Sequence, residues 1–378
     1  MQRNIVITGG HVIDPANGVD EIRDVHIEAG KIVDRTEAEL TIDASGKYVF
    51  PGLIDYHAHV FPGSTEIGID ADASMLHQGV TGVVDPGSAG VANMETFIRD
   101  AARRSTMNVR AYINLCPAGL ATMRYHEDYN PKFWDAPRLA RFLEAYPDIL
   151  LGLKIRISRG ILGEPGFGVV ERAVELAESL HTRLCVHTTD PVGGMAAVAS
   201  ILRRGDILAH CYHGTGSSII GENGRVLPEV RAARERGVIM DAANGGNHWS
   251  FETARAALAD GFPPDIISTD LTCKTLYRDP VFSLPYVMSK YLLLGMELAE
   301  IVRAATVAPA RAMRRPDAPD NGMGTLSFGA TADVAVFALA ERETRFTDTQ
   351  KRVATGRQML VPLMTIRAGE IAYINMLF

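Results

Sequence analysis

The stretch PGLIDYHAHV, residues 51–60, is an apolar run that ends in two histidines separated by a single alanine. Side chains alternate between the two faces of a β-strand, so in a strand His57 and His59 point the same way, about 7 Å apart. A lone pair of this kind also occurs as ordinary packed or surface histidines. The pair therefore becomes a functional signal only if the rest of the chain supplies partners for it.

From Pro51 onward, apolar runs of strand length alternate with segments of helical periodicity. The runs after the first strand are VTGVVD (80–85), NVRAYINL (108–115), ILLGLKIRI (149–157), RLCVHTT (183–189), DILAHC (206–211), GVIMDA (237–242) and DIISTD (265–270). Together with the strand that begins at residue 53 they give about eight strand–helix units over about 265 residues, which predicts an α/β protein built on a (β/α)8 TIM barrel. An open doubly wound sheet is the alternative, but the first turn carries no GxGxxG fingerprint.

Both ends of the chain have a different pattern. Short β-like runs broken by glycine occupy the first 50 residues, and Ala29-Gly30 separates two of them as a hairpin turn would. Similar runs return after residue 320. We therefore predict a small β-sandwich domain built from residues 1–50 and 320–378, with the barrel domain, residues 51–319, inserted between them.

The composition is that of an ordinary globular enzyme. The 378 residues are 47% hydrophobic and 22% charged, with a net charge of −7 and no basic run, which argues against nucleic acid as a partner. No apolar stretch is long enough to span a bilayer, and the N-terminus lacks a secretory pattern. Four widely spaced cysteines fit free thiols in a reducing cytoplasm. We expect a cytoplasmic protein without a membrane partner, and leave open whether it forms a homo-oligomer.

The ionisable residues gather at the predicted strand ends, where barrel enzymes build their active sites. In chain order they are His57 and His59 (first strand), Lys154 (fourth), His187 (fifth), His210 (sixth) and Asp270 (eighth). Lys154 stands inside a very apolar strand, where a charged amine is costly unless it is paired or chemically changed. Each residue alone has an ordinary structural explanation, but the set is hard to obtain by accident.

This order resembles the amidohydrolase superfamily, in particular its two-metal branch of dihydroorotases, hydantoinases, D-aminoacylases and related deacetylases. PGLIDYHAHV is similar to the first-strand signature of that family, and GTLSFGATADVAVF is similar to the stretch that re-enters its small β domain. The resemblance implies two divalent metal ions. It places His57 and His59 on the first ion and His187 and His210 on the second. Lys154 would bridge both ions as an N-carboxylate derived from CO₂, and Asp270 would complete the first site and transfer protons.

The residue types suit this chemistry. Neutral imidazoles are good ligands for zinc, the metal we expect. Burial favours the neutral amine of a lysine, which can add CO₂ to become an anion able to hold two cations. Water held between two such cations loses its proton near neutral pH, and Asp270 can accept that proton and pass it to the leaving group.

The substrate is expected to carry a carboxylate. Dihydroorotases that resemble this chain have an arginine two positions after the second histidine, where it binds the substrate carboxylate; here that position is Phe61, which argues against dihydroorotate. Arg156 is our first candidate for the anion, because strand alternation sends it to the same side as Lys154. The alternative for Arg156 is an ion pair at the barrel rim.

Four further residues are candidates for the substrate site. Arg124, with Tyr125 beside it, lies in the long loop after the third strand and offers a second anion site. His213, just beyond the sixth strand, and His248, in a Gly-rich loop, either donate to a substrate oxygen or hydrogen-bond loops. For His248 we favour the loop.

Three functions remain open. The first is a two-metal hydrolase that removes an acyl group, most simply acetyl, from a small carboxylate-bearing amide or ester. The overall look is closest to deacetylase-like members that act on N-acetyl-amino acids or O-acetyl-2-hydroxy acids. The second is a cyclic amide hydrolase, similar to hydantoinases and dihydroorotases. The third is a metal-free scaffold homologue, against which the full set of ligand positions argues.

Overall fold

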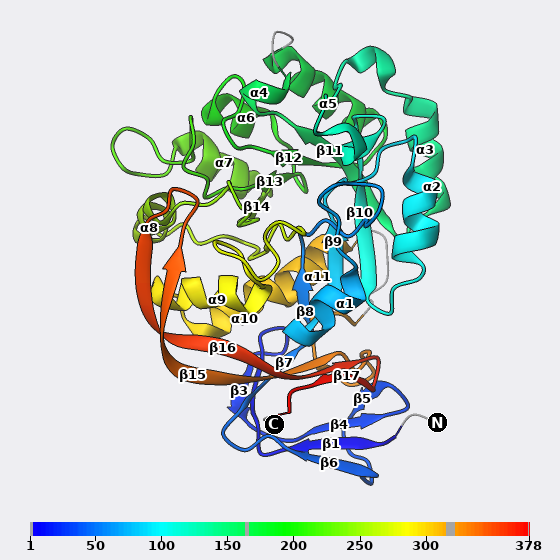
Figure 1. Ribbon diagram of the computed structural model, residues 1–378, viewed down its shortest axis with the longest axis vertical. Coiled ribbons are helices and arrows are strands. Elements are labelled where there is room, and N and C mark those ends of the chain that lie inside the picture. Colours follow the sequence, from blue (N-terminus) through cyan, green and yellow to red (C-terminus); the bar gives the residue numbers. More distant parts are fainter. Residues whose placement is uncertain (1–2, 163–165, 315–321, 377) are drawn as a thin grey trace.

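The computed structural model describes residues 3–162, 166–314, 322–376 and 378. A curled parallel sheet wrapped by helices fills the upper part of the molecule in Figure 1, and sheets made from both ends of the chain lie below it. The curled sheet is the predicted TIM barrel.

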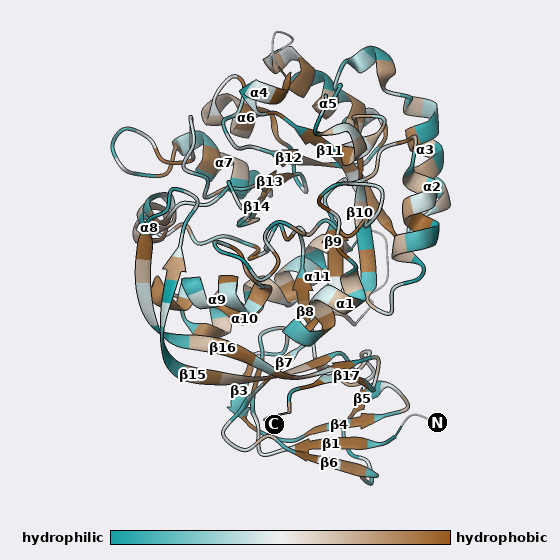
Figure 2. Ribbon diagram, viewed as in Figure 1, coloured by the Kyte–Doolittle hydropathy of each residue, from teal (hydrophilic) through white to brown (hydrophobic). Residues whose placement is uncertain are grey.

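The barrel sheet has seven parallel strands in the order β14-β13-β12-β11-β10-β9-β8. Their bounds are β8 (Leu53–Asp55), β9 (Val80–Asp85), β10 (Asn108–Asn114), β11 (Leu150–Arg156), β12 (Arg183–His187), β13 (Ile207–Ala209) and β14 (Ile239–Asp241). Every residue of β9 is buried, as expected for a parallel strand covered on both faces. Figure 2 shows the same property as brown, hydrophobic segments along the barrel strands, whereas the surrounding helices are of mixed colour.

The predicted eighth strand, residues 265–270, closes the barrel without forming a regular strand. Ile266 makes a parallel bridge to Asp241 on β14, and Leu271 makes one to Ala58 beyond β8. The ladder is interrupted because part of its backbone bonds to a side chain: the Thr269 N–H donates to Asp55 at 3.0 Å. Asp270 then takes a positive φ of 53°. The prediction of a strand is wrong in detail here, although the segment occupies the eighth position.

Helices surround the barrel. Their bounds are α1 (Ala71–Met75), α2 (Met94–Phe97), α3 (Ala136–Ala145), α4 (Arg159–Leu162), α5 (Phe167–Ser179), α6 (Met195–Ile201), α7 (Pro228–Arg236), α8 (Phe251–Ala259), α9 (Leu284–Leu293), α10 (Leu298–Ala305) and α11 (Val307–Met313). Short turns of tighter or wider helix are η1 (Leu76–Gln78), η2 (Ile98–Ala102), η3 (Gly119–Thr122) and η4 (Pro131–Phe133). Within the described residues, each helix is too short or too polar to cross a membrane.

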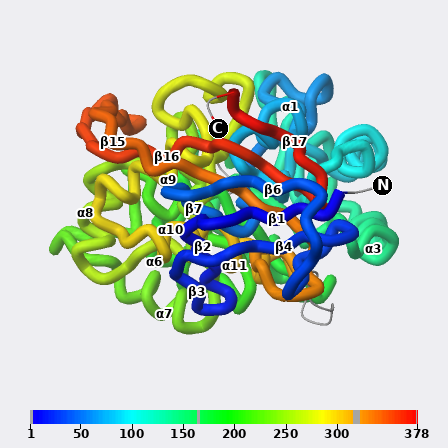
Figure 3. Tube along the Cα trace, turned by 90° about the horizontal axis from the view of Figure 1, so that it is seen from below, coloured from blue at the N-terminus to red at the C-terminus, as the bar shows by residue number. Residues whose placement is uncertain are grey.

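The two chain ends build two further sheets. One has the order β5-β4-β1-β6 and the other β17-β16-β15-β7-β2-β3. The strands are β1 (Ile5–Thr8), β2 (His11–Asp14), β3 (Val19–Ile22), β4 (Val25–Glu28), β5 (Lys31–Val33), β6 (Leu40–Asp43), β7 (Tyr48–Pro51), β15 (Val334–Thr347), β16 (Val353–Arg367) and β17 (Glu370–Ile374). Figure 3 shows strands from both ends of the chain running across the same face of the molecule.

Direct pairing joins the two chain ends. β7 pairs antiparallel with β15, with Val49 opposite Val336, and both residues belong to one apolar cluster shared by the two sheets. The predicted hairpin is confirmed, since Glu28 faces Lys31 across Ala29 and Gly30, which have φ values of 48° and 74°. The predicted domain boundary at 319/320 lies outside the described residues, and the division into domains stays a prediction.

The hairpin formed by β15 and β16 reaches back to the barrel, up to α8 in Figure 1. At its tip the Thr349 Oγ1 donates to the carbonyl of Trp249 at 2.8 Å, and Asp348 accepts from the backbone N–H of Phe251 at 3.1 Å. The Gln350 side-chain amide donates to the Gly214 carbonyl at 2.9 Å. The hairpin thus holds the loops that follow β13 and β14, the same loops that carry His213 and His248.

Candidate metal centre and active site

The first histidine pair lies just beyond the end of β8. His57 Nδ1 is 3.0 Å from an oxygen of Asp241, and His59 Nδ1 is 2.8 Å from the Ser88 hydroxyl. These contacts turn the opposite ring nitrogens inward, where His59 Nε2 is 3.2 Å from Asp270 Oδ1 and His57 Nε2 is 3.9 Å from the same atom. His57, His59 and Asp270 therefore form one group of converging donor atoms.

A second group contains three histidines. His187 ends β12, His210 directly follows β13, and His248 comes from the loop after β14. Their ring centroids are 4.4–4.7 Å apart. His248 Nδ1 lies 2.9 Å from the Thr189 hydroxyl, which fits the expected hydrogen bond to a loop. The ring of His248 is also the third member of this group of possible metal ligands. Its position in a Gly-rich loop after a strand end was the only sequence signal that His248 would lie beside His187 and His210.

Lys154 lies on β11 and is buried. Its Nζ donates to Cys185 Sγ at 3.5 Å. Burial lowers the pKa of His57, His187 and His210 well below the usual histidine value, and the charge of Lys154 contributes to each of these shifts. The imidazoles are therefore neutral near pH 7, the form that binds metal.

All six predicted ligand residues line one cavity of about 270 Å³, together with Arg156 and His248. Its apolar lining is Ile67, Pro86, Leu120 and Met123, and its further polar lining includes Asn247, Thr272, Lys274 and Thr275. The sequence did not lead us to Asn247, Thr272, Lys274 or Thr275. For Thr272, Lys274 and Thr275 the available signal was their place just after Asp270, at the carboxyl end of the eighth barrel segment.

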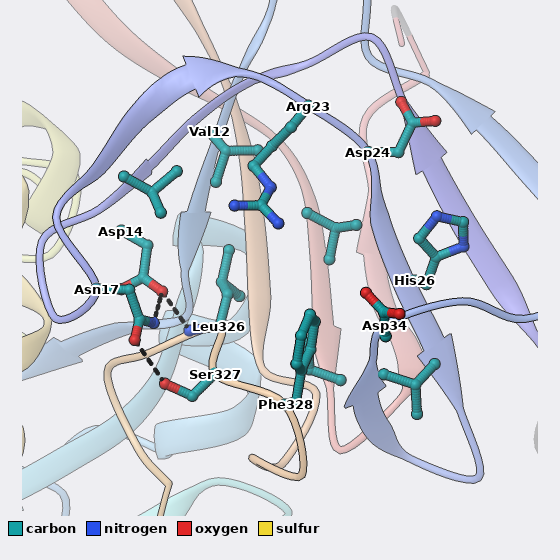
Figure 4. A pocket seen from close by; sticks show the side chains of 14 residues that line it. Val12, Asp14, Asn17, Arg23, Asp24, His26, Asp34, Leu326, Ser327 and Phe328 are labelled. Atoms are coloured by element: carbon teal, nitrogen blue, oxygen red, sulfur yellow. Dashed lines mark hydrogen bonds between the residues drawn. The ribbon is translucent and has the colours of Figure 1, made fainter.

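A second cavity, of about 350 Å³, lies among the terminal strands (Figure 4). None of the predicted site residues lines it. Its buried carboxylate, Asp14, is already bonded by the side chain of Asn17 at 2.5 Å and by the backbone N–H of Leu326 at 2.8 Å. The chemistry predicted from the sequence therefore belongs to the cavity in the barrel.

The predicted substrate residues are dispersed. Arg156 lines the barrel cavity but forms an ion pair with buried Glu127. Arg124 pairs with Glu66 at 2.9 Å, Tyr125 is 83% exposed, and His213 is fully buried. These last three residues are not part of the cavity lining.

Two buried carboxylates support the first histidine pair from behind. Asp241 accepts from the Ser268 hydroxyl at 2.5 Å and contacts His57, while Asp55 accepts from the Thr269 hydroxyl at 2.6 Å. Burial raises the pKa of each to about 7. A carboxylate on the outer nitrogen of a metal-binding histidine fixes both its tautomer and its orientation.

The donor set fits divalent metal ions. The Nδ1 atoms of His57 and His210 face an acceptor, the Asp241 carboxylate and the Ala243 carbonyl at 2.7 Å, so each ring presents the lone pair of Nε2 to the cavity. Imidazole nitrogens with a carboxylate oxygen are the ligands that zinc prefers.

The amidohydrolase family model matches residues 48–372, nearly the whole chain. The chain belongs to the amidohydrolase family. A deacetylase of Agrobacterium fabrum is 32% identical over 330 residues, which cover 87% of this chain and 80% of that protein. Among solved structures, an adenine deaminase has a TM-score of 0.89 at 26% identity, over 99% of this chain and 100% of that one. A dihydroorotase has a TM-score of 0.88 at 30% identity, over 98% and 97%.

This amidohydrolase is thus a hydrolytic enzyme of a family that acts on C–N bonds and generally uses a binuclear metal centre. The residues predicted to bind metal converge in one cavity, and the similar proteins are named as enzymes. Both findings argue against the scaffold alternative.

The substitution Asp241→Asn should weaken zinc binding by about tenfold to a hundredfold, because the amide can no longer fix the tautomer of His57 as the carboxylate does. Competition with a chromogenic chelator measures the affinity. Asp206→Asn is the matched control, since Asp206 is equally buried but bonds Leu184 and Arg203 and lies outside the cavity. Equal losses in the two variants would contradict an orienting role for Asp241.

His213 should make the protein sensitive to acid. Burial, with a contribution from His248, lowers its pKa to about 4, and its Nε2 has no hydrogen-bond partner among the described residues. As the pH falls from about 6.5 to about 4, His213 becomes protonated in the unfolded chain but stays neutral in the folded chain. The free energy of unfolding therefore decreases across that window, by on the order of 3 kcal/mol.

The variant His213→Asn keeps an acceptor for the Thr215 N–H but cannot protonate. Between about pH 7 and about pH 4 its free energy of unfolding should therefore fall by about 3 kcal/mol less than that of the wild type. Denaturant titrations of identically prepared proteins measure the difference. Parallel pH profiles would show that His213 does not titrate in this way.

Proposed function

We propose that this amidohydrolase removes an acyl group, most simply acetyl, from a small amide or ester that carries a carboxylate, and that it does so with two divalent ions, zinc in the first instance. The observation that supports this best is the convergence of two donor groups, one of which contains Asp270, on a single cavity. A deacetylase relative at 32% identity supports acyl removal.

In the proposed site, His57, His59 and Asp270 would hold one ion, and His187 and His210 would hold the other. Lys154, once carboxylated by CO₂, would supply an anionic ligand able to serve both ions. A bound pair of divalent ions supplies Lewis acidity and water that ionises near neutral pH. The proton transfers are carried out by side chains of the protein itself.

Asp270 is the proposed proton carrier. One of its oxygens lies 3.2 Å from His59 Nε2 and the other 3.8 Å from His248 Nε2, so the carboxylate faces the space between the two donor groups. There it takes the proton of the attacking water and delivers it to the leaving nitrogen or oxygen. His248, whose pKa burial lowers to about 4, stays neutral near pH 7 and adds no fixed positive charge beside Asp270.

Phe61 supports a substrate other than dihydroorotate. At the position where dihydroorotases that resemble this chain carry an arginine, Phe61 is buried and packs edge-on against Phe97, with ring centroids 5.2 Å apart. It does not line the cavity. The cyclic-amide alternative therefore has no anion-binding group at that point.

A substrate screen tests the proposal. The zinc-loaded enzyme should hydrolyse members of a panel of N-acetyl-amino acids and O-acetyl-2-hydroxy acids, each tested as both enantiomers. Hydantoin, dihydroorotate and adenine serve as competing substrates in the same assay. Turnover restricted to one of these three would replace acyl removal with ring opening or deamination.

Asp270→Asn should lower kcat by about 10²–10⁴-fold and leave KM nearly unchanged, because the lost proton transfer acts only in the transition state. Zinc content measured on the same preparation separates this effect from loss of metal. A variant that kept more than about a tenth of the wild-type kcat would show that another group carries the proton.

A further inference from the structure

We propose that Lys274 binds the substrate carboxylate and sets the preference for acids over their uncharged esters, in place of the arginine that the sequence favours. The inference rests on the proposed function for the presence of a carboxylate substrate. It adds the group that recognises this carboxylate.

The charge of Arg156 is already balanced. Its guanidinium pairs with Glu127, which also accepts from the Tyr129 hydroxyl at 3.2 Å. Glu127 is 8% exposed, so pulling Arg156 away toward a substrate would leave a buried carboxylate without its cation, which is strongly unfavourable. Arg156 thus supports the wall of the cavity through Glu127.

Arg124 is also poorly placed to bind a substrate carboxylate in the cavity. It pairs with Glu66, is largely exposed, and lies outside the cavity lining. Neither arginine is therefore free to meet a substrate anion inside the cavity.

The cavity lining contains three lysine or arginine side chains: Lys154, Arg156 and Lys274. Lys154 is the proposed metal ligand and Arg156 is paired with Glu127, so Lys274 is the one that has no role yet. It lines the same cavity as Asp270, and the structure gives its ammonium no acidic partner among the described residues. Only three residues separate it from Asp270, so the two Cα atoms are at most about 14 Å apart. That limit suits a small substrate whose carboxylate lies close to the scissile bond.

The backbone around Lys274 is held in place. The Lys274 N–H donates to Thr272 Oγ1 at 3.2 Å, and the Cys273 N–H donates to the Ile67 carbonyl at 3.0 Å. The Thr272 N–H donates in turn to Thr275 Oγ1 at 3.0 Å. The base of the lysine side chain is therefore positioned, although the residue as a whole is exposed.

The rest of the lining indicates the class of acid. Ile67, Leu120 and Met123 offer apolar surface, while Asn247 and Thr272 are uncharged polar residues. A compound with an apolar substituent and a carboxylate on the carbon next to the acylated nitrogen or oxygen matches both kinds of surface. N-acyl derivatives of apolar 2-amino acids and O-acyl derivatives of apolar 2-hydroxy acids have this chemistry.

The test uses zinc-loaded enzyme with N-acetylmethionine of each hand and the corresponding methyl esters. Lys274→Met should raise KM for the acid by about tenfold to thirtyfold, as expected for losing a hydrogen bond to a charged group, and change the ester less than twofold. The loss on the acid should shrink in high salt, because a water-exposed ion pair is screened. Lys132→Met, an exposed lysine outside the cavity, is the control for removing one positive charge and should match the wild type.

Arg156→Met provides the comparison within the cavity and should affect acid and ester by the same factor. Equal losses on acid and ester in Lys274→Met would overturn the proposal. So would an acid-specific loss in Arg156→Met with Lys274→Met unaffected, which would return the carboxylate to Arg156.

Calorimetric titration of the same four compounds separates this inference from the proposed function. If the wild type binds the acid without hydrolysing it and Lys274→Met loses that binding, the assignment of Lys274 holds although acyl removal from these compounds fails. If the wild type binds the acid no better than the ester, or binds neither at millimolar concentration, the assignment of Lys274 is wrong.

Discussion

Asp270 connects the closure of the barrel to the chemistry of its cavity. Its backbone N–H donates to the His57 carbonyl at 2.6 Å and so ties the last barrel segment to the first. Its carboxylate oxygens face His59 and His248, which belong to different donor groups. If the eighth segment were placed differently, the barrel would be open, and the carboxylate that faces both donor groups would be lost from the cavity.

The site depends equally on residues that never reach the cavity. Asp241 lies behind His57, and Asp55 holds Thr269, the residue before Asp270. On the outer side, the tip of the β15–β16 hairpin bonds to Trp249, which directly follows His248. The strand pair β15–β16 thus supports the loop of the barrel that carries His248, which gives the sheets at the chain ends a role beyond covering the barrel.

The sequence predicted those parts of the molecule that follow from local patterning. Buried parallel strands appear as continuous apolar runs, and side chains at strand ends must meet in a closed barrel. The convergence of the six proposed ligands in one cavity could therefore be predicted from their places along the chain. The Glu127 partner of Arg156 could not, because it lies in a long loop whose path no periodicity reveals. Lys274 was missed for a similar reason: it follows a segment that side-chain bonds bend away from regular strand geometry.

Diffraction from zinc-loaded crystals, recorded at the zinc absorption edge, tests whether the cavity holds a bridged two-metal centre. We expect two anomalous peaks, one at His57, His59 and Asp270 and the other at His187 and His210, with carboxylate density on Lys154 Nζ between them. A single peak, or two peaks beside an unmodified lysine, would contradict the bridged two-metal centre.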